Sequence, residues 1–139
     1  KIFLGDVGSL PLGGLLAWFM ISLAASGEVL AALLLPGYYL LDATRTLYCR
    51  WRNGEDVKAA HRKHAYQRAQ GEGGMAVPDI AEAVVLANIL LAVLAILSVY
   101  YGNRGIDALC ALGGVIVLYR LMEVLETAAG RSTHAAPQE

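Results

Sequence analysis

Residues 83–103 read AVVLANILLAVLAILSVYYGN, and this stretch contains no Asp, Glu, Lys or Arg. A second uncharged stretch, residues 7–27, reads VGSLPLGGLLAWFMISLAASG. A transmembrane helix needs about 20 mostly apolar residues to cross a hydrocarbon core of roughly 30 Å, so each stretch is long enough to cross a membrane once. The two stretches predict two transmembrane helices and an all-α fold.

The composition agrees with a membrane protein. Of the 139 residues, 57% are hydrophobic, and the mean hydropathy of +0.51 is high for a soluble domain. A further span is predicted around Pro36-Gly37, which should kink it, and another before Glu126. We therefore expect an all-α polytopic membrane protein with about four transmembrane helices, at about residues 8–26, 29–48, 81–101 and 106–125.

The basic residues predict how these spans are oriented. Seven of the eleven Lys and Arg residues fall between Arg45 and Arg68. Because loops on the cytoplasmic side carry an excess of Lys and Arg, the loop at 49–79 is expected to be cytoplasmic and to bear a short helix. Asp6 and the C-terminus would share that side, with the turns near residues 27 and 102–105 outside.

The ends of the chain carry two further expectations. Residues 1–126 are expected to form the membrane portion, followed by a disordered polar tail at 127–139. Since the chain begins at Lys1 directly on an apolar residue, we expect it to be the C-terminal part of a longer protein.

An acidic residue stands where the first span begins. Residues 3–13, FLGDVGSLPLG, set Asp6 between Gly5 and Gly8. A carboxylate in a glycine-rich turn suits Mg²⁺, which binds one or two carboxylates together with substrate phosphates. The alternative is that Asp6 caps a helix N-terminus, where a carboxylate meets the positive end of the helix dipole.

The predicted cytoplasmic loop contains the segment HRKHAYQRA, residues 61–69. In a helix, His61, His64 and Arg68 would lie on one face. Arg can bind diphosphate oxygens in a bidentate way, and neutral His can donate a hydrogen bond to the same group or bind a metal. The alternative is a basic surface helix that is attracted to anionic lipid headgroups.

Two charged residues fall within the second predicted span. Asp42 and Arg45 lie three residues apart, so we expect them to form an ion pair along one helix near its cytoplasmic end.

Three segments together resemble the polyprenyl-phosphate N-acetylhexosamine-1-phosphate transferases, the membrane family of glycosyltransferase family 4. They are KIFLGDVGS at residues 1–9, followed by Leu12 and Gly13; YLLDAT at 39–44; and HRKHAYQRA at 61–69. The family contains the phospho-N-acetylmuramoyl-pentapeptide transferase and the bacterial enzymes that initiate O-antigen and other surface glycans. The form of the 61–69 segment looks closer to the glycan-initiating branch.

This resemblance implies a reaction and a set of site residues. A polyprenyl phosphate, usually undecaprenyl phosphate, would attack the β-phosphorus of a UDP-N-acetylhexosamine and release UMP. Asp6 would be a catalytic residue and the ligand of Mg²⁺, with Mn²⁺ as an alternative ion, and His64 would be the second catalytic residue. The residues that would bind the substrate are His61, Arg62, His64, Gln67 and Arg68.

The same resemblance implies partners and a location. The expected partners are polyprenyl phosphate, the UDP-amino sugar, the membrane and a missing N-terminal half, with a homodimer as one arrangement and no nucleic acid. That half would supply acidic motifs that are not found in this chain, so the chain alone is expected to be inactive. The location implied is the inner membrane, with the site in the cytoplasm.

Two other functions compete with this one. A small membrane scaffold or regulator could use the basic loop to bind anionic lipid or a partner, and it would not depend on Asp6. A transporter fragment would instead make the intramembrane Asp42 the important residue.

Overall fold

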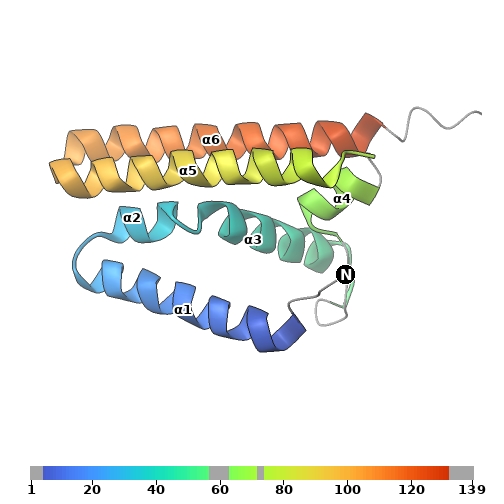
Figure 1. Ribbon diagram of the computed structural model, residues 1–139, viewed down its shortest axis with the longest axis horizontal. Helices are drawn as coiled ribbons and strands as arrows, with labels where there is room; N and C mark the ends of the chain where they lie inside the picture. Colours follow the sequence, from blue (N-terminus) through green and yellow to red (C-terminus); the bar gives the residue numbers. More distant parts are fainter. Residues whose placement is uncertain (1–4, 57–62, 72–73, 132–139) are drawn as a thin grey trace, which may run out of the picture.

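The computed structural model describes residues 5–56, 63–71 and 74–131, without the side chains of residues 5, 6, 9 and 131. In this part of the chain the structure is helical and has no strand, which confirms the all-α prediction (Figure 1). The helices are α1 (Gly5–Ala25), α2 (Val29–Leu34), α3 (Gly37–Arg52), α4 (Ala65–Gly71), α5 (Val77–Tyr101) and α6 (Arg104–Arg131).

Two of the described helices are long and apolar enough to cross a membrane, namely α5 and, over Arg104–Gly130, α6. Fewer than a third of the residues in the most apolar window of each helix are buried. A core helix of a soluble protein would be mostly buried, so these exposed apolar surfaces suggest a membrane protein. Helix α1 contains a shorter apolar helical segment, Leu10–Ala25.

The second predicted span is not one helix. Helix α2 ends at Leu34 and α3 begins at Gly37, so the break falls at the proline, where a kink was expected. Pro36 has no N–H to donate to the preceding turn and its ring interferes with the carbonyl four residues earlier. The two pieces have 6 and 16 residues, so each is shorter than a membrane crossing requires.

Helices α5 and α6 form an antiparallel hairpin with a short turn. Gly102 closes α5 with a left-handed φ of +54°, and its N–H donates to the Ser98 carbonyl. The Asn103 side-chain oxygen then accepts hydrogen bonds from the N–H groups of Gly105 and Ile106, which caps the start of α6. This local chemistry explains why the two long helices turn back at this point.

Small residues allow close packing beside this hairpin. A Cβ atom on Gly113 would lie 3.2 Å from Leu94 of α5, and one on Gly114 would collide with Leu34 of α2. These two glycines therefore permit the close helix approach that small residues provide in membrane bundles. Among the described residues, by contrast, nothing lies within 4 Å of a Cβ built on Gly13 or Gly14 of α1.

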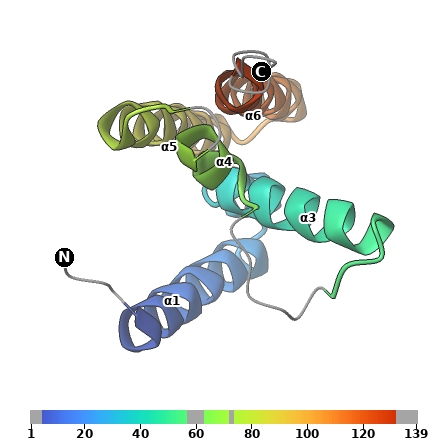
Figure 2. The same cartoon turned by 90° about the vertical axis from the view of Figure 1, so that its right-hand side faces the viewer.

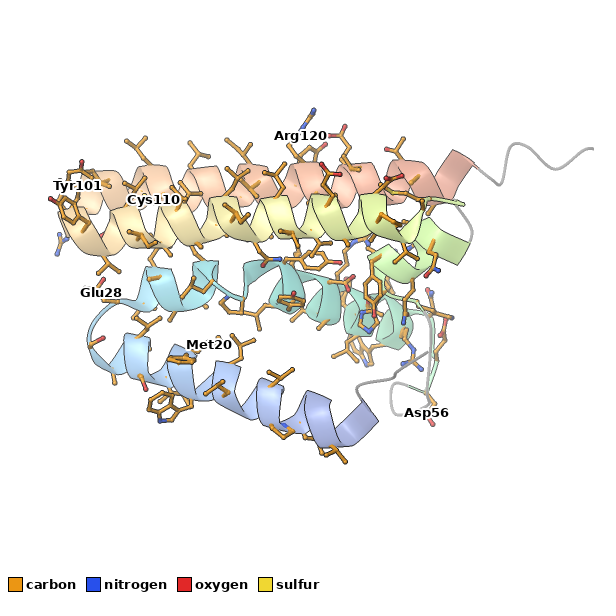
Figure 3. All side chains as sticks on the ribbon, in the orientation of Figure 1. Met20, Glu28, Asp56, Tyr101, Cys110 and Arg120 are labelled. Atoms are coloured by element: carbon orange, nitrogen blue, oxygen red, sulfur yellow. The ribbon has the colours of Figure 1, made fainter. Side chains whose placement is uncertain are left out.

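The helix ends and turns gather at two opposite ends of the molecule. The start of α1, the end of α3, helix α4, the start of α5 and the end of α6 all lie at one end, and the α1–α2 and α5–α6 turns lie at the other (Figure 1). Figure 3 shows Asp56 at the first end and Glu28 and Tyr101 at the second. The start of α1 and helix α4 therefore lie at the same end of the molecule.

Helix α4 lies between α3 and the hairpin, as the end view in Figure 2 shows. Ala65 and Ala69 of α4 are buried in a core cluster that also contains Leu125 and Ala128 of α6. This contact corrects two expected boundaries: α6 continues past residue 125 to Arg131, and residues 127–131 are helical instead of belonging to a disordered tail. Residues 132–139 lie outside the described part.

Candidate functional site

A buried carboxylate of α3 binds the start of α4. Asp42 is only 5% exposed, and its Oδ2 atom lies 2.9 Å from Nδ1 of His64. Its Oδ1 atom accepts a hydrogen bond of 2.9 Å from the backbone N–H of Ala65, the first residue of α4. One side chain therefore binds both the imidazole and the helix that follows it. The N-terminal cap of α4 is supplied by a residue of α3.

This geometry corrects two expectations from the sequence. Asp42 pairs with His64 instead of with Arg45, which forms an ion pair with Glu126 of α6. The segment 61–68 is not one continuous helix either, because α4 begins at Ala65 and residues 63 and 64 are not helical. The helical spacing proposed for His61, His64 and Arg68 therefore does not apply.

Gln67 and Arg68 of the predicted loop motif lie in α4. The Gln67 side-chain oxygen is 3.4 Å from the backbone N–H of His64, a long contact with the geometry of a capping box. The backbone N–H of Arg68 donates to the His64 carbonyl at 3.0 Å. These bonds fix the first turn of α4 and tie Gln67 and Arg68 to His64, the residue that precedes the helix.

A buried guanidinium anchors the end of α3. Arg50 is 3% exposed, its Nε atom lies 3.5 Å from Glu55, and a second nitrogen donates to the Asp56 carbonyl. Gly54 has a φ of +72°, and the Glu55 N–H donates back to the Arg50 carbonyl at 3.0 Å. This turn needs a left-handed residue, and it returns the Glu55 carboxylate to the side chain of Arg50.

Lys63 completes this network from the far side of the loop. Its ammonium group lies 2.6 Å from each carboxylate oxygen of Glu55. The hydrogen bond from Lys63, assisted by Arg50, lowers the pKa of the Glu55 carboxyl below its usual value. Glu55 therefore joins the end of α3 to the segment that leads into α4.

These basic residues surround a polar pocket of about 260 Å³. Four cationic side chains and one carboxylate line it, together with two short polar side chains and a thiol. The lining residues are Arg45, Thr46, Cys49, Arg50, Asn53, Glu55, Lys63 and Arg68. The excess of positive charge gives the pocket the chemistry of an anion site, and guanidinium groups are well suited to phosphate oxygens.

An apolar cavity of about 560 Å³ lies beside this pocket, between α3 and α6. Its walls include Leu41, Leu118 and Met122, and Arg45 lines both the cavity and the polar pocket. The cavity and the polar pocket therefore share the guanidinium group of Arg45, which forms an ion pair with Glu126.

A third cavity, of about 530 Å³, contains the His64 ring. Tyr38, Tyr39, Tyr66 and Asp42 are among its other lining residues. The rings of His64 and Tyr66 are stacked, with centroids 5.8 Å apart and an interplanar angle of 17°. The Tyr38 hydroxyl is buried without a hydrogen-bond partner in the described part of the chain. The wall of this cavity therefore contains a polar group that could bind a ligand.

Some predicted site residues cannot be placed with these groups. Asp6 lies in the first turn of α1, at the same end of the molecule as α4, but its side chain is outside the described residues. His61 and Arg62 fall in the undescribed segment 57–62. Of the predicted site residues, the structure therefore brings together His64, Gln67 and Arg68.

The described residues do not fit a metal cage made by the protein alone. Among them, no group of three or more His, Cys, Asp or Glu side chains could hold an ion. Mg²⁺ often takes only one or two carboxylates and completes its shell with substrate phosphates and water. The expected metal site therefore depends on Asp6 and on the family resemblance.

Sequence reasoning missed several residues at this end. Asp42 was assigned to a local pair, and Arg50, Lys63 and Tyr38 were given no part in the site. One signal was available, because residues 57–64 (VKAAHRKH) contain no Ser, Thr, Asp or Asn to cap the helix that follows. A helix start without a local cap indicates that a more distant residue supplies it.

No protein-family model matches the chain, and comparisons with curated proteins and with solved structures also gave no match.

Proposed function

We propose that this chain is the C-terminal membrane portion of a transferase that initiates cell-surface glycan synthesis. The enzyme would move N-acetylhexosamine 1-phosphate from a UDP-sugar to undecaprenyl phosphate at the cytoplasmic face of the inner membrane. A phosphate oxygen of the lipid would bond to the β-phosphorus of the donor. The bond from that phosphorus to the bridging oxygen would break, and UMP would leave.

One observation carries this proposal: a cationic pocket and an apolar cavity share Arg45, at the end of the molecule where α4 lies. A lipid phosphate needs an apolar wall for its chain and positive charge for its head, and a nucleotide diphosphate needs further positive charge. Phosphoryl transfer depends chiefly on positioning and on neutralising charge, which Arg, Lys and His side chains can supply.

The named residues would have distinct roles. Arg68 would bind diphosphate oxygens, and Gln67 would hold the turn that carries His64. His61 and Arg62 would extend the donor site. Asp6 would hold Mg²⁺, which when bound supplies positive charge to the diphosphate. The missing N-terminal half would contribute further acidic residues.

The test is UMP release from UDP-N-acetylhexosamines by the full-length protein, with undecaprenyl phosphate and Mg²⁺ in detergent micelles. Asp6→Ala and His64→Ala should each abolish release. Glu28→Gln is the matched control, because Glu28 lies at the opposite end of the molecule (Figure 3). Release that is indifferent to both site substitutions, or no release with any donor, would overturn the proposal and favour a scaffold that binds anionic lipid.

A further inference from the structure

We propose that Asp42 is a positioning residue that fixes the tautomer and the orientation of His64. The inference starts from the two contacts of one carboxylate: Oδ1 with the Ala65 N–H and Oδ2 with His64 Nδ1, each at 2.9 Å. Its consequence for turnover rests on the proposed function, whereas the positioning itself does not.

The proton assignment follows from what a carboxylate can do. An ionised Asp accepts hydrogen bonds and donates none, so His64 must carry a proton on Nδ1 to bind Oδ2. In the neutral imidazole the lone pair then belongs to Nε2. A carboxylate that fixes a histidine tautomer through Nδ1 is a recurring arrangement in proteins whose histidines bind metals or transfer protons.

Orientation is fixed as well as protonation. Asp42 is 5% exposed on α3, so its carboxylate has little freedom to follow a moving ring. Ala65, whose N–H binds the same carboxylate, is buried in the core cluster formed with α6. The stacked Tyr66 ring supports the imidazole further. The ring is thus held through its own nitrogen and through the first residue of the helix that follows it.

This placement gives Asp42 a role that a simple helix cap would not have. A cap needs only an acceptor for the Ala65 N–H, which an asparagine oxygen can also provide. Asparagine would then turn its NH₂ group toward His64 and donate to Nδ1, which forces the imidazole proton onto Nε2. Asp42→Asn therefore preserves the cap and inverts the tautomer, and so separates the two roles.

The experiment records ¹⁵N spectra of histidine-labelled full-length protein in nanodiscs. The chain has three histidines, and the His64→Gln spectrum identifies the His64 signals. In the unmodified protein the protonated signal should belong to Nδ1, and in Asp42→Asn it should move to Nε2. Asp107→Asn is the control, because this carboxylate accepts a 2.6 Å hydrogen bond from Ser98 at the α5–α6 turn and should leave His64 unchanged. His64 signals that are the same in Asp42→Asn as in the unmodified protein would overturn the proposal.

Turnover provides a second, separate readout. Asp42→Asn should lower kcat by about 10- to 100-fold, the loss that is typical when the hydrogen-bond partner of a metal-binding histidine is altered. His64→Gln removes the imidazole itself, so it should lower turnover at least as far as Asp42→Asn does. Unchanged turnover in Asp42→Asn, where the unmodified protein is active, would overturn the positioning role. Absence of turnover in the unmodified protein would count against the transferase function only, since the ¹⁵N signals decide the positioning.

Discussion

Arg45 of α3 forms an ion pair with Glu126 of α6, although Asp42 lies three residues away on its own helix. The pair joins two helices that lie on opposite sides of the apolar cavity lined by Leu41 and Met122. Asp42 is left to bind His64 and α4. Because Arg45 pairs with Glu126 and Asp42 binds His64 and Ala65, α3 is connected to both α6 and α4 at this end of the molecule.

The Arg45–Glu126 pair should add little to the free energy of unfolding. The two side chains are 39% and 34% exposed, and pairs of this exposure typically contribute about 0.2–1 kcal/mol. A double-mutant cycle with Arg45→Met and Glu126→Gln, followed by circular dichroism during unfolding in mixed micelles, should give a coupling in that range. A coupling several times larger would mean that lipid or protein shields the pair from water.

Gly114 should be intolerant of larger residues. A side chain at this position meets Leu34 and Leu91, both of which are buried. Gly114→Leu should therefore destabilise the fold by about 1–3 kcal/mol, the usual cost of overpacking. Gly13→Leu is the matched control, because a Cβ there meets nothing within 4 Å among the described residues. Similar losses from both variants would contradict the packing around α6.

The helical class and the main helices could be predicted because their causes are local. Uncharged apolar stretches determine α5 and most of α1, and Pro36 lacks the N–H that a continuous helix would need at the break between α2 and α3. The length of α6 could not be predicted in the same way. Ala128 is a weak signal in the sequence, and it is buried in the core cluster that it shares with Ala65 and Ala69 of α4.

The site was harder to predict because its contacts are not local. His64 lies 22 residues after Asp42, and no spacing rule relates the two. The rule for residues three apart favoured Arg45 as the partner of Asp42, but burial of Asp42 against α4 decided otherwise. The motif at 61–69 did locate the segment that carries His64, Gln67 and Arg68, although it assigned that segment too long a helix.

The Glu55 carboxyl should titrate below its usual pKa of 4.5, because the hydrogen bond from Lys63 stabilises the charged form. A lowered pKa in the folded state means that the stabilisation is present above pH 4.5 and is lost as the pH falls through the folded value. Carboxyl NMR titration should give a low midpoint for Glu55. Lys63→Met should return it toward 4.5, and Lys63→Arg should not. An unchanged midpoint in Lys63→Met would exclude this ion pair in solution.

The two cysteines should report on orientation. Cys49 is exposed near the end of α3 and Cys110 is buried in α6. If the α4 end is cytoplasmic, a membrane-impermeant maleimide should label Cys49 in inverted vesicles and not in right-side-out vesicles. Cys49→Ser should abolish this labelling, because Cys110 is inaccessible. Labelling in right-side-out vesicles alone would reverse the proposed orientation.

Arg68 should show whether the polar pocket binds the donor. Arg68→Lys keeps the charge but loses the planar fork that binds two phosphate oxygens, so KM for the UDP-sugar should rise about 10-fold with little change in kcat. Arg52→Lys is the control, because Arg52 is exposed at the same end of α3 and does not line the pocket. Titration calorimetry with UDP should show the same difference in affinity. If both variants lose affinity equally, positive charge in general attracts the nucleotide. If neither does, the Arg68 guanidinium does not hold the diphosphate.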